Sequence, residues 1–133
     1  MKVESGQDLT RDHEVSCDVC IVGSGAGGAV LAAGLCEAGL KVVMLEEGSY
    51  RTSADFRSLS EAVNTPMLYQ ERGTRSTADV AITILQGRSV GGSTTVNWTT
   101  CFRTPSRILA HWQARFGLDA LGPGSLDEHF QAV

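Results

Sequence analysis

The chain has 133 residues and a mass of 14.1 kDa, a length typical of a single domain. Hydrophobic residues make up 42% and charged residues 20% of it, which is the composition of an ordinary soluble globular protein. The net charge of −4 argues against a nucleic-acid-binding surface. No apolar run approaches the roughly 20 residues that cross a bilayer.

Residues 1–16 are polar and lack the apolar core of a secretory signal. They predict a flexible lead-in and a cytoplasmic location, and they leave residues 17–133 as the structured part of the chain.

The next residues predict a βαβ unit. Val19–Val22 is a short apolar strand, a glycine-rich turn follows, and a helix is expected over about residues 27–38. Gly39 ends this helix, and residues 41–45 form a second buried strand. A strand, turn, helix and strand within about 30 residues is typical of a parallel sheet. The fold class expected is therefore α/β, with a Rossmann-like parallel sheet.

Residues 48–77 are polar and irregular, with one short helix around residues 56–63. Apolar residues at 80, 82 and 84 predict a further strand over residues 80–85. It leads into a second glycine-rich loop.

Two helices are expected near the C-terminus. Thr104 as the N-cap and Pro105 in the first turn begin one helix, and Gly117 ends it. Its buried face would be formed by Ile108, Leu109, Trp112 and Phe116. A capping box over residues 125–128 begins the other helix.

The four cysteines are Cys17, Cys20, Cys36 and Cys101. Cys17-x-x-Cys20 has the spacing of half a zinc or redox site. Residues three apart on a strand point to opposite faces, and no second pair completes a tetrahedral site. We therefore expect four small, buried, reduced thiols and no metal.

The first glycine loop, residues 23–28, reads GSGAGG and matches G-x-G-x-x-G through Gly23, Gly25 and Gly28. These glycines permit a tight turn, close approach to a pyrophosphate, and close helix–strand packing. Glu46 follows Gly28 by 18 residues, near the spacing of about 20 for an acid that binds a ribose. A glycine-rich turn without a ligand is the alternative, and no P-loop pattern is present.

The second glycine loop, residues 87–97, reads GRSVGGSTTVN. Its backbone donors, hydroxyls and amide can hold a flat heterocycle or a diphosphate, and a polar turn is the alternative. The segment VVMLEEG, residues 42–48, lies between the two loops. Together, the two loops and this segment resemble the motifs of the glucose–methanol–choline (GMC) family of flavin oxidoreductases. The continuation NWTTCFRTP resembles the long-chain alcohol oxidase branch and its bacterial relatives.

The resemblance implies that residues 17–133 are the N-terminal part of an FAD-binding domain. It places Gly23, Ser24, Gly25 and Gly28 around the FAD pyrophosphate and Glu46 on the adenosine ribose. It places Gly91, Gly92, Ser93 and Asn97 beside the pyrophosphate and the isoalloxazine, with Thr100 as a weaker contact. Some members carry a flavin-linking histidine where this chain has Val96, so non-covalent FAD is expected.

The resemblance also implies alcohol oxidation at CH–OH groups by hydride transfer to the flavin, with oxygen or a redox protein as electron acceptor. The family's catalytic histidine lies near its C-terminus, and its members are several times longer. His13, His111 and His129 match no such context, so we expect no catalytic residue and no substrate domain in this chain. The alternatives are a non-catalytic dinucleotide-binding module or inactive remnant, and an NAD-linked dehydrogenase.

Overall fold

The computed structural model describes residues 2–57 and 60–132. It divides into two compact units, of which the first ends at Asn97 and the second begins at Trp98. The described residues before residue 17 are all exposed and include a short 3-10 helix, η1 (Gly6–Asp8).

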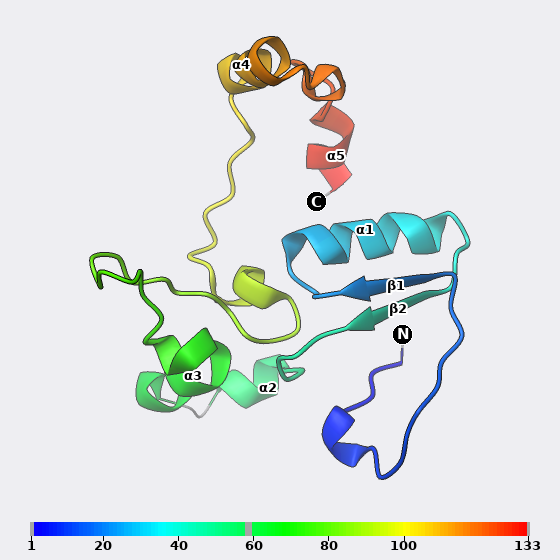
Figure 1. The fold of residues 1–133 in the computed structure, drawn as a ribbon, viewed down its shortest axis with the longest axis vertical. Helices are drawn as coiled ribbons and strands as arrows, with labels where there is room; N and C mark the ends of the chain where they lie inside the picture. The colour runs from blue at the N-terminus through cyan, green and yellow to red at the C-terminus, as the bar shows by residue number, and fades with distance from the viewer. Residues whose placement is uncertain (1, 58–59, 133) are drawn as a thin grey trace. The chain divides into compact units, whose positions relative to one another are not determined.

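The predicted βαβ unit is the centre of the first unit. It consists of β1 (Val19–Val22), α1 (Ala26–Glu37) and β2 (Val42–Leu45). The two strands pair in parallel from Val19↔Val42 to Val22↔Leu45, and α1 lies along one face of the pair (Figure 1). The expected α/β fold with a parallel sheet is thus confirmed.

Local backbone chemistry explains where α1 ends. Gly39 adopts a left-handed conformation with φ of +84°. The N–H of Leu40 then donates to the carbonyl of Leu35 at 3.0 Å, which is the closing bond of a Schellman motif. The helix stop predicted at Gly39 is confirmed.

Close contact between α1 and β1 requires a glycine at position 28. A Cβ there would lie 2.1 Å from the carbonyl oxygen of Gly23 and 3.3 Å from Cγ2 of Ile21. Ile21 is the buried residue of β1, with 7% of its surface exposed. The helix–strand packing expected of Gly28 is therefore present.

The remainder of the first unit contains short helical segments. They are α2 (Ser53–Phe56), α3 (Glu61–Leu68), η2 (Gln70–Gly73) and η3 (Gly92–Val96). The single helix expected around residues 56–63 is wrong, because α2 ends at Phe56 and α3 begins at Glu61. Residues 58 and 59 of that expected helix lie outside the described residues.

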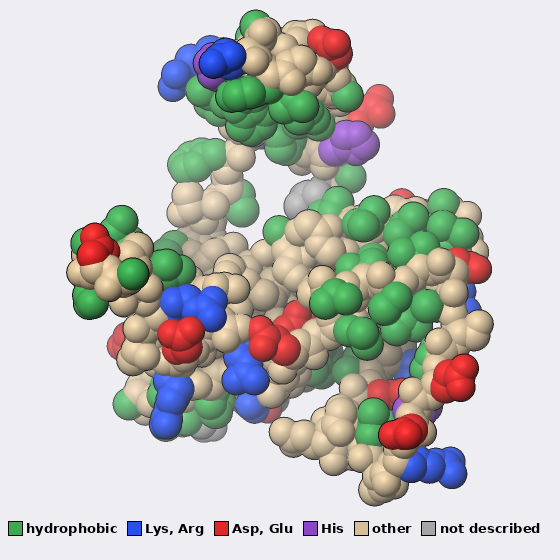
Figure 2. Space-filling model, viewed as in Figure 1, with side chains coloured by type: hydrophobic (Ala, Val, Ile, Leu, Met, Phe, Trp, Pro, Cys, Tyr) green, Lys and Arg blue, Asp and Glu red, His purple; other side chains and the backbone are tan. Residues whose placement is uncertain are grey.

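The strand predicted over residues 80–85 is also wrong. This segment forms a hairpin-like loop, in which the Thr77 N–H donates to the Ile82 carbonyl at 3.0 Å. At its tip the Asp79 carboxylate accepts from the Thr77 hydroxyl and the Ala81 N–H, at 2.5 and 3.2 Å. This side-chain turn places Val80 in a left-handed conformation with 77% of its surface exposed. Figure 2 shows hydrophobic side chains exposed on this loop.

The second unit contains α4 (Ser106–Phe116), η4 (Asp119–Leu121) and α5 (Asp127–Ala132). Gly117 ends α4 in a left-handed conformation, as predicted. Pro105, not Thr104, occupies the N-cap position: its ψ of 139° is not helical, and its carbonyl accepts from the N–H groups of Ile108 and Leu109 at 2.8 and 3.3 Å.

Two further predictions for this unit need correction. Leu109 of α4 is buried, but Phe116 is 62% exposed and lies off the buried face. The expected capping box over residues 125–128 does not form. Instead, the Ser125 hydroxyl donates to the Gly122 carbonyl at 2.6 Å, and α5 begins at Asp127.

The expectation of buried cysteines is wrong as well. All four thiols are free, but Cys17 is only half-buried and the other three are exposed. Cys20 is exposed because it points to the face of β1 opposite Ile21, and α1 covers the Ile21 face. None of the helices in the described part of the chain has the length and apolar character of a membrane span.

Candidate functional site

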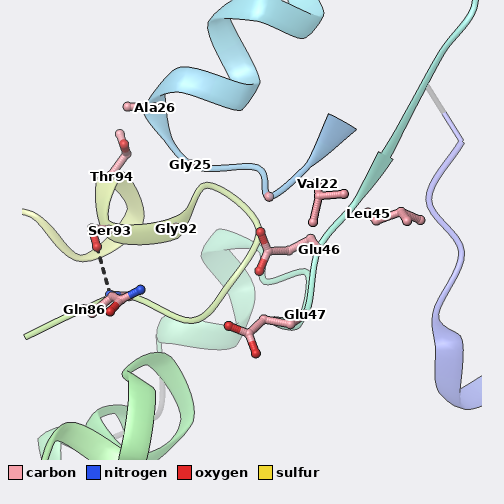
Figure 3. A pocket seen from close by; sticks show the side chains of 12 residues that line it. Val22, Gly25, Ala26, Leu45, Glu46, Glu47, Gln86, Gly92, Ser93 and Thr94 are labelled. Atoms are coloured by element: carbon pink, nitrogen blue, oxygen red, sulfur yellow. Dashed lines mark hydrogen bonds between the residues drawn. The ribbon is translucent and has the colours of Figure 1, made fainter. Parts of the chain in front are cut away.

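A cavity of about 480 Å³ lies where β1 and β2 end (Figure 3). The carboxyl ends of parallel strands are where α/β proteins bind ligands, and cavities of this volume accommodate small molecules. Its lining comes from both glycine loops and from the end of β2. The lining residues are Val22, Gly23, Gly25, Ala26, Leu45, Glu46, Glu47, Gln86, Gly87, Gly92, Ser93 and Thr94.

The first glycine loop turns sharply out of β1 into α1. Gly23 has φ of +93° and donates its N–H to the Leu45 carbonyl at 2.8 Å, which ties the turn to β2. Gly25 is the N-cap of α1 and supplies no side-chain cap. The first N–H groups of a helix have no partner within it, so this end of α1 can donate hydrogen bonds to an anion.

Glu46 follows β2 and is held by three hydrogen bonds. Its Oε2 accepts from the N–H and the hydroxyl of Ser24 at 2.9 and 2.7 Å, and its Oε1 accepts from the Gly48 N–H at 2.8 Å. Burial acts to raise the pKa of the Glu46 carboxyl, but the hydrogen bonds from Ser24 and Gly48 outweigh burial and lower this pKa below its ordinary value. Glu46 is therefore a carboxylate at neutral pH.

The second glycine loop lies directly against the first loop and the end of β2. The Gly91 N–H donates to the Ser24 hydroxyl at 2.9 Å, and Ser49 and Ser89 form a parallel bridge. A Cβ on Gly92 would lie 3.0 Å from the Gly25 Cα. These contacts place residues far apart in sequence around one cavity.

The expected site residues divide into three groups. Five of them line the cavity: Gly23, Gly25, Glu46, Gly92 and Ser93. Another three, Ser24, Gly28 and Gly91, lie behind the lining and make the contacts described above. Asn97 is exposed where η3 ends, and Thr100 belongs to the second unit; neither lines the cavity.

Seven lining residues were missed by the sequence predictions: Val22, Ala26, Leu45, Glu47, Gln86, Gly87 and Thr94. Glu47 projects beside the predicted Glu46 from the end of β2 toward the second glycine loop (Figure 3). Glu47 is anchored by Gln70 and by Arg88, whose Nε lies 3.6 Å from Glu47 Oε2. The side chain of Ser93 accepts from the Gly87 N–H at 3.0 Å. Two features of the sequence could have indicated these residues: Glu47 directly follows the predicted Glu46, and Gly87 is the first residue of the second glycine loop.

The histidines lie elsewhere among the described residues. His13 Nε2 is 3.4 Å from Glu4 Oε2. The His111 and Phe116 rings pack edge to face, with their centroids 5.9 Å apart. None of the three histidines belongs to the lining of the cavity as described.

Comparison with known proteins identifies relatives for both halves of the chain. Residues 65–133 match the family model of the GMC oxidoreductases, and residues 21–66 match an NAD(P)-binding Rossmann-like domain. The crystal structure of pyridoxine 4-oxidase from Mesorbium loti superimposes with a TM-score of 0.65 at 28% identity. The match covers 89% of this chain and 24% of that one.

Curated proteins extend the similarity. A long-chain-alcohol oxidase of Arabidopsis thaliana (FAO4B) is 42% identical over 82% of this chain and 15% of its own length. An uncharacterized GMC-type oxidoreductase of Sinorhizobium fredii is 33% identical over 96% of this chain and 25% of its own length. The chain thus spans a quarter or less of these relatives. Because the family model covers more than half of its residues, the chain belongs to the GMC oxidoreductase family.

Proposed function

We propose that residues 17–133 form part of the FAD-binding domain of an oxidoreductase that oxidises alcohol CH–OH groups, with residues 1–16 as a lead-in. The observation that carries this proposal is the convergence of both glycine loops and Glu46 on one cavity. Membership of the GMC family and the oxidase neighbour imply a flavin cofactor.

The residues present fit a flavin dinucleotide. The space beside Gly25 is open, since a Cβ built there meets no atom within 4 Å. The uncapped N-terminus of α1 adjoins this space and favours a negatively charged group. Glu46, ionised at neutral pH, is a hydrogen-bond acceptor for ribose hydroxyls and repels a ribose phosphate.

In this proposal each loop holds a different part of the cofactor. Gly23, Gly25 and Gly28 shape the turn around the pyrophosphate, and Glu46 accepts hydrogen bonds from the adenosine ribose. The second glycine loop lies beside the pyrophosphate and the isoalloxazine through Gly91, Gly92, Ser93 and Asn97, with Thr100 as a weaker contact. Val96 has no nucleophilic side chain, so the flavin link that some members make at this position is absent, and we expect the FAD to be bound non-covalently.

The bound flavin supplies the hydride acceptor, while the residues of this chain bind and orient it. The names of the relatives, long-chain-alcohol oxidase and pyridoxine 4-oxidase, support an alcohol as the substrate. They also support oxygen as the electron acceptor, with a redox protein as the other candidate.

The test is spectroscopic. The purified chain is expected to show flavin absorption and to release FAD on denaturation. Protein that contains this chain together with a substrate domain is expected to lose its oxidised-flavin band when a long-chain alcohol is added without oxygen. Flavin in that protein that no alcohol reduces would indicate a binding module. Bound nicotinamide dinucleotide without flavin would overturn the proposal in favour of an NAD-linked dehydrogenase.

Replacing Glu46 by alanine is expected to weaken FAD affinity by roughly 1–3 kcal/mol, the scale of a lost charged hydrogen bond. Titration of deflavinated protein with FAD measures the change at pH 7. Glu37→Ala is the matched control, because Glu37 is an exposed acid at the end of α1. Equal affinities for the two variants would remove Glu46 from the ribose site.

The same carboxyl predicts an acid limit to cofactor binding. The pKa of the Glu46 carboxyl is lowered from 4.5 in the folded protein. The ionised carboxylate therefore contributes fully to the stability of the fold above pH 4.5, and this contribution is lost as the pH falls through the lowered pKa. FAD affinity of the native protein should therefore be independent of Glu46 titration between pH 6 and 8, because this whole range lies above 4.5 and the pKa of Glu46 is lower still. An affinity that rises across this range only when Glu46 is present would contradict the assignment.

A further inference from the structure

We propose that Ser24 is a positioning residue that couples the Glu46 carboxylate to the second glycine loop. The inference rests on the proposed function, because it concerns the same cofactor site. It changes the role expected of Ser24 from a cofactor contact to a link between the groups that make those contacts.

The contacts of Ser24 carry this proposal. Its side chain is buried, with only 3% of the residue exposed, and it does not line the cavity. Its hydroxyl donates to Glu46 Oε2 at 2.7 Å and accepts from the Gly91 N–H at 2.9 Å. A hydroxyl has one proton to donate, and here that proton is committed to Glu46.

The direction of these bonds makes the link cooperative. The Gly91 N–H can only donate and the carboxylate can only accept, so the Ser24 hydroxyl is polarised from the second loop toward Glu46. Hydrogen bonds arranged in such a chain strengthen one another. The hydrogen bond from Gly91 to Ser24 therefore strengthens the hydrogen bond from the Ser24 hydroxyl to Glu46. Displacement of the second glycine loop would weaken it.

The other carboxylate oxygen is tied to the same loop by a different route. Glu46 Oε1 accepts from the Gly48 N–H, and Gly48 lies directly against the backbone of Arg88 and Ser89. A carboxylate offers about four acceptor positions. Two of the three hydrogen bonds described above engage Oε2 and one engages Oε1, so Oε1 is the less occupied of the two oxygens.

The first experiment compares FAD affinity in reconstituted protein carrying Ser24→Ala with that of the Ser53→Ala control. Ser53 is an exposed serine at the start of α2. Ser24→Ala is expected to weaken FAD binding about tenfold, the scale of one lost bond to a charged group, and Ser53→Ala to leave it unchanged. Ser24→Cys keeps the shape of the side chain, with a somewhat larger atom in place of the hydroxyl oxygen, but supplies only a weak S–H donor, so it should also weaken binding.

A double-mutant cycle with Glu46→Ala separates positioning from direct contact, because alanine removes the acceptor of both Ser24 hydrogen bonds. If Ser24 acts through Glu46, the Ser24→Ala change should cost little FAD affinity in the Glu46→Ala background. Losses that add in full would overturn the proposal, because Ser24 would then act independently of Glu46.

Hydrogen exchange of the Gly91 amide gives a readout that needs no flavin. This amide should exchange faster in deflavinated Ser24→Ala protein than in the Ser53→Ala control. Unchanged Gly91 exchange would overturn the proposal, and so would faster exchange with native FAD affinity. Native protein that binds no FAD would refute the proposed function itself, which is a different outcome from either of these.

Discussion

Protein carrying Gly25→Val is expected to fold normally and to contain almost no flavin. Gly25 has φ of −63° and ψ of −176°, which a valine adopts without strain. A Cβ at this position meets no protein atom within 4 Å. The added side chain would therefore occupy the cavity where the pyrophosphate must approach the backbone.

Flavin content per folded protein and the thermal unfolding midpoint of the apoprotein together measure this effect. Gly27→Val is the matched control, because Gly27 also has open space around its Cβ but lies outside the cavity lining. Gly28→Val should behave differently from both, since its Cβ clashes with the Gly23 carbonyl and lowers stability. Full flavin occupancy in Gly25→Val would refute the assignment of the first glycine loop.

The βαβ unit was predictable because its signals are local and agree with one another. The apolar residues of β1 and β2 border a glycine turn, and Gly39 supplies the left-handed residue that stops α1. A parallel pair joined by one helix then follows from the connection alone. All of these signals lie within residues 19–45, so the unit could be predicted from neighbouring residues alone.

The strand expected over residues 80–85 failed because turn chemistry overrode apolar alternation. Asp79 accepts hydrogen bonds from both sides of the tip, which bends the chain where a strand would have to run straight. Among the residues that the structure describes, no apolar surface of a neighbouring element buries Val80 or Ile82, which are 77% and 62% exposed. Alternation indicates a strand only where one face is covered.

Most of the glycines that line the cavity were predictable, but the contacts that support them were not. Gly91 and Ser24 are 67 residues apart, and no local pattern indicates that they meet. Gly48 stands in the quoted VVMLEEG motif, yet its packing against Ser89 depends on the path of the whole intervening segment. Contacts of this kind come from the tertiary fold, not from local propensity.

Replacing Gly48 by alanine is expected to separate the second glycine loop from the end of β2. The added Cβ would lie 2.2 Å from the Ser89 nitrogen and 2.4 Å from the Arg88 carbonyl carbon. Both are backbone atoms, so no side-chain rotation relieves the clash. The loop must move, and the 3.2 Å hydrogen bond from the Val90 N–H to the Ser49 carbonyl is the first contact at risk.

We expect this substitution to lower the free energy of unfolding by about 3 kcal/mol, the upper part of the usual range for overpacking, and to release the flavin. Denaturant unfolding and retained flavin measure the two effects. Gly34→Ala is the matched control, because Gly34 lies inside α1 with open space around its Cβ and alanine there should stabilise the helix by about 1 kcal/mol or less. Gly48→Ala protein that unfolds like the native chain and keeps its flavin would mean that neither stability nor flavin binding depends on close packing of the second glycine loop against the end of β2. Flavin loss in stable Gly48→Ala protein would instead separate the loop's role in binding from its role in folding.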